Sequence, residues 1–461
     1  MSRTETERRP AAPPPSSSAV TTGRRIALVA VVAAAVWLYV TRISPVGPWH
    51  AEFDLKVYRG AVIWWLDHKP LYRFHRNATP YGFTYPPFAA LVLMPWAWVS
   101  QTAAMVLNEI LSALLIVLLS WWMVAPVAKR RGWPRWYAVA LAVPLVYVME
   151  PVRETLAYGQ VNLILVALVL GDLLAAARGW RWAGIGIGVA TAIKLTPGLF
   201  LVYLALTGRW RQAAVAVGTA AGATLLGLAV APGTSIQFWL HTLFDTDRVG
   251  KLWYASNQSL MGVLARQAQP GQPNKALWAA LALVVLIGGM WRARQAFRRG
   301  DELAGVTLTG LVTCLVSPIS WTHHLFWLVP AALILIDVAL GAPVRLPAGS
   351  RLRNRPRLRT RLAAGGAAVV VAVSVSSVMW LATDSAGHGH RTGVLGFLMV
   401  NSYVLVMVAL VAGLPSRALR ATAAGDPGGP EGPGEEAVSG PAEPSAGRTT
   451  APPRPAGSSP R

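Results

Sequence analysis

The sequence predicts an all-α protein that crosses a membrane many times, and two observations carry this prediction. First, 54% of its 461 residues are hydrophobic and only 13% are charged, about half the charged fraction of an ordinary soluble domain. Second, the basic residues behind the net charge of +22 fall in clusters between apolar runs. Such clusters are typical of cytoplasmic loops in membrane proteins, so the positive charge does not indicate nucleic-acid binding.

The apolar runs and the basic clusters together define the expected spans. Arg24 and Arg25 precede the first run, so the positive-inside rule places the N-terminus in the cytoplasm. At up to about 25 residues per span, the sequence gives about 12 crossings. They cover residues 26–40, 102–124, 136–150, 161–177, 182–193, 197–207, 212–231, 276–291, 303–317, 325–341, 362–383 and 393–413. The short pair on either side of Lys194 is a candidate for a re-entrant or thinned hairpin.

Residues 88–99 are apolar as well, but a crossing there would place the basic residues 129–131 outside the cell. We therefore expect residues 88–99 to lie in, or dip into, the outer leaflet. They close a first external loop over residues 43–100, which also carries the interfacial helix discussed below.

The two ends of the chain differ in composition from its centre. Residues 1–23 are rich in Pro, Ser, Thr and Arg, and residues 414–461 are rich in Pro, Gly, Ala and Glu. Neither segment can bury enough apolar surface to fold, so both are predicted to be disordered cytoplasmic tails. The residues between them, 24–413, are expected to form one transmembrane domain. Cys314 is the only cysteine, which excludes an intramolecular disulfide.

This topology gathers the reactive side chains on one side of the membrane. Every histidine and several carboxylates fall on or near the outer face, opposite the basic loops. A conducting pathway would spread polar groups through the membrane, so the asymmetry favours an extracytoplasmic active site in a multi-pass cell-membrane protein. The residues concerned are His50, His68, His75, His241, His323, His324, His388, His390, Glu52, Asp54, Asp67, Glu154, Asp245 and Asp247.

Asp54 begins a predicted interfacial helix over residues 54–66. Leu55, Tyr58 and Val62 recur there at helical spacing, with charged residues on the remaining surface. An acid at the mouth of a membrane protein is a candidate for function. Aspartate is also a favoured N-cap residue, so local sequence leaves both interpretations open.

Lys194 lies inside an apolar run, where an ammonium group is costly unless it meets an anion or reaches the interface. A phosphate is the natural partner. His323 and His324 lie between two spans and are candidates for phosphate hydrogen bonding or proton transfer, or they face lipid headgroups. Gln160 and Asn162 stand at a helix start, where amides bind sugar hydroxyls or, as local sequence favours, cap the helix.

Metal sites are weakly indicated. Asp245 with Asp247, and His388 with His390, each offer only two ligands in a loop. Asp54 has no adjacent second acid. We therefore expect no cofactor and no obligatory metal, and a divalent ion is left open.

A series of motifs follows Asp54 along the chain. In order they are Asp54-Leu-Lys-Val-Tyr58, Pro70-Leu-Tyr72, Phe83-Thr-Tyr-Pro-Pro87, Tyr158-Gly-Gln-Val-Asn162, Ile193-Lys-Leu-Thr-Pro197, Asn257-Gln-Ser259 and Ser317-Pro-Ile-Ser-Trp-Thr-His323-His324. This combination resembles glycosyltransferase family 87, the polyprenol-phosphate-mannose-dependent α-mannosyltransferases of actinobacteria with the GT-C membrane fold. The resemblance covers residues 24–413 and leaves out both tails.

The resemblance implies a hexosyltransferase that works by inverting transfer. Mannose would pass from β-linked polyprenyl-phosphate-mannose to an extracytoplasmic glycolipid or lipoglycan, giving an α-mannoside. Asp54 would be the general base that takes the proton of the attacking hydroxyl. The donor phosphate would be bound by Lys194, His323, His324 and, more weakly, Arg59. The residues expected to contact the sugar or the acceptor are Tyr58, Tyr85, Gln160, Asn162, Asn257 and Gln258.

Two rival functions remain open from the sequence. A GT-C arabinosyltransferase with a polyprenyl-phosphate-arabinose donor would share these motifs. A polyprenyl-phosphosugar flippase would also have many spans and an embedded lysine, but it needs no general base. A purely structural scaffold would leave Lys194 and the outward histidines unexplained.

Overall fold

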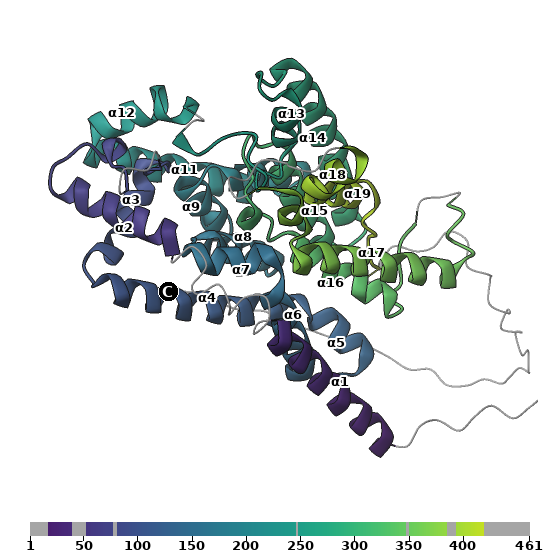
Figure 1. Ribbon diagram of the computed structural model, residues 1–461. Coiled ribbons are helices and arrows are strands. Elements are labelled where there is room, and N and C mark those ends of the chain that lie inside the picture. The colour runs from purple at the N-terminus through teal and green to yellow at the C-terminus, as the bar shows by residue number, and fades with distance from the viewer. Residues whose placement is uncertain are drawn as a thin grey trace, which may run out of the picture. The chain divides into compact units, whose positions relative to one another are not determined.

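The computed structural model describes residues 17–38, 52–76, 81–245, 248–346, 350–384 and 393–418. Within these residues the chain is helical, with two isolated β-bridges and no longer strand, which confirms the all-α prediction for this part of the chain (Figure 1). The positions of His50, Asp247, His388 and His390 lie outside the described residues.

Most of the α-helices coincide with predicted apolar stretches or with the predicted helices of the first external loop. They are α1 Ser17–Leu38, α2 Phe53–Leu66, α3 Pro87–Ala97, α4 Gln101–Met123, α5 Ala125–Arg131, α6 Arg135–Val148, α7 Glu150–Tyr158, α8 Asn162–Ala177, α9 Ile185–Ile193, α10 Leu199–Leu206, α11 Trp210–Val230, α12 Pro232–Leu240, α13 Leu260–Ala268, α14 Lys275–Arg298, α15 Glu302–Val316, α16 Leu328–Ala339, α17 Pro356–Ser376, α18 Gly393–Val400 and α19 Ser402–Gly413. Of these helices, α5, α7, α12 and α13 were not predicted. Short 3-10 helices are η4 Leu71–Arg73, η5 Thr196–Gly198, η6 Thr242–Phe244, η8 Thr322–His324 and η9 Val378–Ala382.

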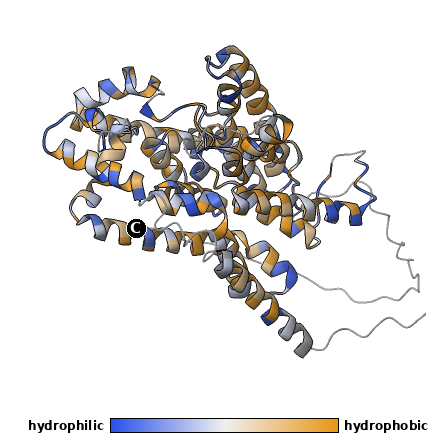
Figure 2. Cartoon of the chain, in the orientation of Figure 1, coloured by the Kyte–Doolittle hydropathy of each residue, from blue (hydrophilic) through white to orange (hydrophobic). Residues whose placement is uncertain are grey.

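Several of these helices suit a membrane. In the described residues α4, α11, α14 and α17 are each long and apolar enough to cross, and two bent pairs raise the number to 6. The pairs are α7 with α8, bent by 119°, and α18 with α19, bent by 70°. Apolar residues cover most of the helices (Figure 2). The chain is therefore a multi-pass membrane protein, while the count of about 12 crossings stays a prediction.

The outer surfaces of the long helices are apolar. Leu114 of α4 is 63% exposed, Leu225 of α11 is 62% exposed and Val284 of α14 is 69% exposed. Rows of exposed large apolar side chains are unfavourable in water, because apolar surface has a lower free energy in an apolar solvent such as lipid. These helix faces are therefore solvated by lipid. The helix α3 has 11 residues, roughly 16 Å of axis, about half of a bilayer core. This length fits the predicted helix that does not cross.

The folded domain extends beyond the predicted tail boundaries. Helix α1 begins at Ser17, within the segment expected to be disordered. At the other end Arg417 is only 2% exposed and pairs with Asp301 and Asp337. The prediction of a tail from residue 414 was wrong for residues 414–418, because the carboxylates that bind Arg417 lie far from it in sequence.

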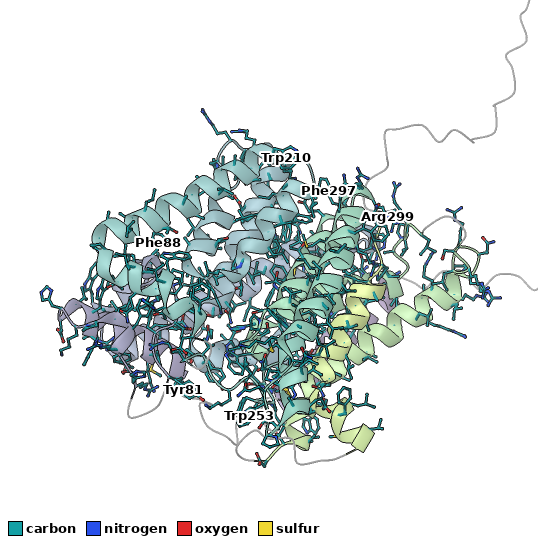
Figure 3. The ribbon with its side chains drawn as sticks, turned by 90° about the horizontal axis from the view of Figure 1, so that it is seen from above. Tyr81, Phe88, Trp210, Trp253, Phe297 and Arg299 are labelled. Atoms are coloured by element: carbon teal, nitrogen blue, oxygen red, sulfur yellow. The ribbon has the colours of Figure 1, made fainter. Side chains whose placement is uncertain are left out.

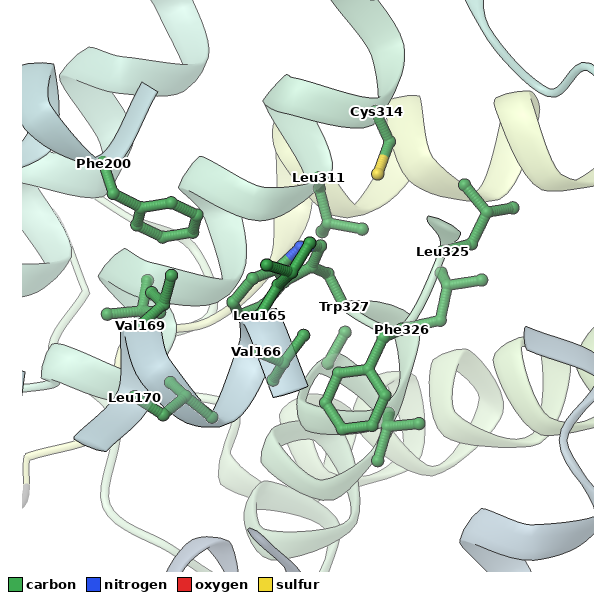
Figure 4. Packing of buried hydrophobic residues seen from close by; sticks show 14 of the residues in the cluster. Leu165, Val166, Val169, Leu170, Phe200, Leu311, Cys314, Leu325, Phe326 and Trp327 are labelled. Atoms are coloured by element: carbon green, nitrogen blue, oxygen red, sulfur yellow. The ribbon is translucent and has the colours of Figure 1, made fainter. Parts of the chain in front are cut away.

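A dense apolar core supports the region around Lys194. Leu165, Val166, Phe200, Leu311 and Trp327 converge there from α8, α10, α15 and the start of α16 (Figure 4). The rings of Phe200 and Trp327 lie 5.2 Å apart. Interiors packed in this way resist small displacements, so the end of α9 at Lys194 is held in one position.

Candidate active site

A cavity of about 590 Å³ brings residues from several of the motifs together, and its size is in the range of ligand-binding pockets. Its walls come from α2, the loop before α3, the junction of α7 with α8, the break after α9, the loop after α12 and the segment before α16. Tyr81 of this cavity and the nearby Trp253 lie at one edge of the molecule, and Trp210, Phe297 and Arg299 lie at the opposite edge (Figure 3). The edge of the cavity at Tyr81 thus lies opposite the basic segments 209–211 and 292–299, which the positive-inside rule predicts to be cytoplasmic.

Asp54 lines this cavity from the first turn of α2. The helix N-cap is Glu52, in a left-handed conformation with φ 49° and without a side-chain capping bond. The N-cap interpretation of Asp54 was therefore wrong. Instead its Oδ2 accepts a hydrogen bond from Nε2 of Gln160 at 2.6 Å. The positive end of the helix dipole also favours the ionised carboxylate.

Gln160 links Asp54 to the aromatic residues of the cavity. Its Oε1 accepts from the hydroxyl of Tyr58 at 3.0 Å and from that of Tyr85 at 3.3 Å. Burial raises the pKa of Tyr58 well above its ordinary value, so this hydroxyl keeps its proton. With Oε1 held as an acceptor, Nε2 is fixed as the donor that faces Asp54. Gln160 therefore orients the carboxylate.

Gly159 allows Gln160 to reach α2. Its φ is +66°, and a Cβ there would lie 2.7 Å from Cβ of Leu55. Only glycine tolerates both the left-handed backbone and this close approach. The prediction that Gln160 and Asn162 cap α8 was wrong, because Val161 is the N-cap of this helix and no side chain caps it.

Lys194 is buried at the end of α9. The carboxylate of Asp172 accepts from the amide nitrogens of Gly184 at 2.7 Å and Ile187 at 3.2 Å, which fixes the start of that helix. Pro197 has no N–H to donate to the carbonyl of Ile193, so the α-helix cannot continue through this point. The helix ends at Ile193, and the backbone of Lys194, its C-cap, is extended, with φ −147°.

Two N–H groups face one another at Lys194. Its Nζ lies 2.9 Å from Nε2 of His324 and donates to Oδ1 of Asn162 at 3.1 Å. Nδ1 of His324 accepts from the backbone N–H of Trp321 at 3.2 Å, so the hydrogen of the neutral ring is on Nε2. Within the described residues Lys194 forms no ion pair. Two facing donors without a carboxylate form a site for an anion.

His323 serves the other side of the cavity. Its Nε2 lies 3.3 Å from Nε2 of Gln160, and its ring lies 5.1 Å from that of Tyr158. Its carbonyl accepts from Nδ2 of Asn162 at 2.8 Å. The rings of the two adjacent histidines are 88° apart. The two side chains point in different directions, His323 toward Gln160 and His324 toward Lys194.

Four of the predicted contact residues have other roles. Asn162 is occupied by Lys194 and by the carbonyl of His323. Arg59 is absent from the cavity wall and donates to the carbonyls of Trp96 and Val99, at the end of α3. We therefore no longer assign Arg59 to the donor phosphate.

Asn257 and Gln258 are fully buried and do not line the cavity. The amide of Asn257 binds backbone groups of Leu252, Pro318 and Ser320, and that of Gln258 binds those of Ala255, Val400 and Val404. Because these two amides already form hydrogen bonds with backbone groups, the prediction that they contact the sugar or the acceptor was wrong.

The sequence reasoning missed Glu52 as a buried acid. Its side chain is 3% exposed, and within the described residues neither carboxylate oxygen has a hydrogen-bond partner. Burial, and then the nearby Glu109, raise its pKa to about 7. No local pattern marks it. Arg248 and Lys251, also on the cavity wall, could have been found as cations in an outer loop.

Comparison with known proteins shows the family of this chain. The chain belongs to glycosyltransferase family 87, whose family model matches residues 83–318, more than half of its length. The match includes Gln160 and Lys194 but ends before His323 and begins after Asp54. The resemblance of the motifs is thereby confirmed, and the protein is a glycosyltransferase.

Curated relatives come from mycobacteria. A polyprenol-phosphate-mannose-dependent alpha-(1-2)-phosphatidylinositol mannoside mannosyltransferase of Mycobacterium tuberculosis is 35% identical over 62% of this chain and 70% of its own length. The enzyme of the same description from Mycolicibacterium smegmatis is 34% identical over the same shares. A Mycobacterium tuberculosis phosphatidylinositol pentamannoside mannosyltransferase is 32% identical over 70% of this chain and 73% of its own length. No solved structure matches the chain significantly.

Proposed function

We propose that this protein transfers mannose, with inversion, from polyprenyl-phosphate-mannose to a phosphatidylinositol-mannoside acceptor on the outer side of the membrane. The observation that carries the proposal is the shared cavity. Its wall holds an oriented carboxylate, Asp54, and a buried cation, Lys194, which forms no ion pair within the described residues. The names of the relatives support mannose over arabinose as the sugar and a mannosylated phosphoinositide as the acceptor.

Asp54 is the proposed general base. An acceptor hydroxyl hydrogen-bonded to its carboxylate attacks the anomeric carbon, and its proton passes to Asp54. The bond between that carbon and the phosphate oxygen breaks as the new glycosidic bond forms, so a β-mannosyl phosphate gives an α-mannoside. The bonding electrons leave with the polyprenyl phosphate.

Lys194 and His324 are the proposed phosphate-binding pair. The two nitrogens are 2.9 Å apart, so a phosphate oxygen would lie beside the pair and accept an N–H from each. Fixed donors of this kind stabilise the charge that develops on a leaving phosphate in a water-poor site. His323 lies on the side of Gln160, where it would contact the sugar or the acceptor. Both termini are proposed to be cytoplasmic.

Asp54→Asn tests the base. We expect kcat for transfer from polyprenyl-phosphate-mannose to fall about 100- to 10,000-fold, because a positioned base contributes about that factor. Purified protein in nanodiscs would be assayed for mannolipid product, with donor binding measured in parallel. Binding should persist, since the amide keeps the shape of the carboxylate.

Undiminished turnover in D54N would remove Asp54 as the base. Sugar-lipid translocation that survives D54N, without product from either protein, would instead support a flippase. Transfer from polyprenyl-phosphate-arabinose alone would overturn the choice of mannose.

A further inference from the structure

A second positive cluster lies on the cavity wall, away from Lys194 in sequence. Arg248 and Lys251 come from the loop between η6 and α13, and both line the cavity. Nη2 of Arg248 donates to the carbonyl of Tyr72, which fixes the guanidinium. Its Nε is buried and has no hydrogen-bond partner among the described residues. The guanidinium is therefore anchored and still has a free donor.

This cluster has no anionic partner in the described part of the chain. Neither Arg248 nor Lys251 forms an ion pair there. Asp245 lines the same wall, but it is exposed and forms no ion pair with them. Within the described residues the positive charges of Arg248 and Lys251 are therefore not paired with a carboxylate.

The cluster is flanked by exposed apolar side chains. Leu240, at the end of α12, is 64% exposed, and Phe244 of η6 is 73% exposed. Apolar side chains next to cations are typical of a surface that binds an anionic lipid, with acyl chains on the apolar part and the phosphate on the cations. A free phosphate would use only the cations.

We propose that Arg248 and Lys251 bind the phosphodiester of the glycolipid acceptor. The cavity would then hold two phosphates, the donor's at Lys194 and His324 and the acceptor's at Arg248 and Lys251, with Asp54 on the same wall. A guanidinium and an ammonium match the single charge and the oxygens of a phosphodiester. This inference rests on the proposed mannosyl transfer and identifies how the acceptor is recognised.

The test compares two acceptors. Wild type, R248Q and K251Q in phosphatidylcholine nanodiscs would be given polyprenyl-phosphate-mannose with either a phosphatidylinositol mannoside or an alkyl α-mannoside that lacks phosphate. We expect each variant to raise KM for the phosphate-bearing acceptor about 10-fold or more, the effect of losing one charge-assisted hydrogen bond. KM for the alkyl mannoside should stay unchanged.

Lys275→Gln is the matched control, because it removes an exposed positive charge at the start of α14 that does not line the cavity. An equal loss with both acceptors would mean a structural role for Arg248, and no loss would mean no role. Either result overturns the subsite. So does a KM effect in R248Q that appears only after anionic phospholipid is added to the nanodiscs of both wild type and variant, since the cluster would then bind bulk lipid. Absence of wild-type transfer to either acceptor would instead refute the proposed function.

Discussion

Two buried charged clusters of this protein differ in one respect. Arg417 is enclosed by carboxylates: it binds both oxygens of Asp301, at 2.8 and 2.9 Å, and Oδ2 of Asp337 at 3.1 Å. Arg130 pairs with Asp337 as well. Lys194 is also buried, but it meets a histidine and an amide, and in the described part of the chain it forms no ion pair with a carboxylate.

The difference supports the proposal that the cluster around Arg417 is structural, whereas Lys194 binds a ligand. A buried ion pair neutralises itself, and removing one partner leaves an uncompensated charge in the interior. A buried cation without an anion already carries that cost in the folded protein. A buried Lys194 does not help the stability of the fold. Binding of the proposed phosphate would explain why a lysine stands at this position.

Arg417→Leu should be the most destabilising change in this comparison. It leaves Asp301 and Asp337 short of a cation, and we expect unfolding to become easier by about 3–5 kcal/mol. Thermal unfolding in detergent would measure this, with KM in the surviving folded protein unchanged. Adding Asp301→Asn, which keeps the oxygen that caps α15, should recover part of the loss. A stability equal to wild type for R417L would show that the cluster contributes nothing.

Lys194→Met should show the reverse pattern. We expect kcat/KM for the lipid-phosphate donor to fall about 100- to 1,000-fold, the effect of losing one preorganised donor to a developing charge. The thermal midpoint should stay the same or rise, because an unpaired buried ammonium is removed. Lys194→Arg keeps the charge and is the control. A midpoint that drops as far as that of R417L would make Lys194 a structural residue.

Gln160→Leu tests the orientation of the base. Losing one hydrogen bond to a carboxylate costs about 1.5–3 kcal/mol, so we expect kcat to fall about 10- to 100-fold with little change in acceptor KM. Tyr85→Phe is the graded control, because Tyr58 can still donate to Gln160. A rise in KM without a fall in kcat would indicate that Gln160 binds sugar directly.

Glu52→Gln should change only the pH dependence of stability. The folded pKa of Glu52 is raised to about 7 from 4.5. The neutral acid therefore stabilises the fold below about pH 4.5, and this contribution is lost as the pH rises through about 7. The variant should match wild type in thermal midpoint at about pH 4.5 and exceed it at about pH 8. Asp67→Asn, an exposed acid just after α2, is the control. Parallel curves for wild type and E52Q would refute the buried-acid interpretation.

The sequence predicted much of the candidate site because its reactive side chains stand in short, recognisable motifs. Asp54, Lys194, His323 and His324 were singled out as an acid, a buried cation and a histidine pair, and the cavity brings all of them together. The roles of the amide side chains could not be predicted from the sequence. Gln160, Asn257 and Gln258 look alike in sequence, and only their packing shows that one orients a carboxylate while the others satisfy the backbone.

The sequence by itself determined that this is an all-α membrane glycosyltransferase with an acid after its first apolar run, since hydropathy and motif order are properties of neighbouring residues. The tertiary structure decided which polar atoms meet. The hydrogen bond between Gln160 and Asp54 spans 106 positions of the chain and the ion pair between Arg417 and Asp301 spans 116. Hydrogen bonds act over about 3 Å, so they depend on how distant helices pack, which no local pattern records.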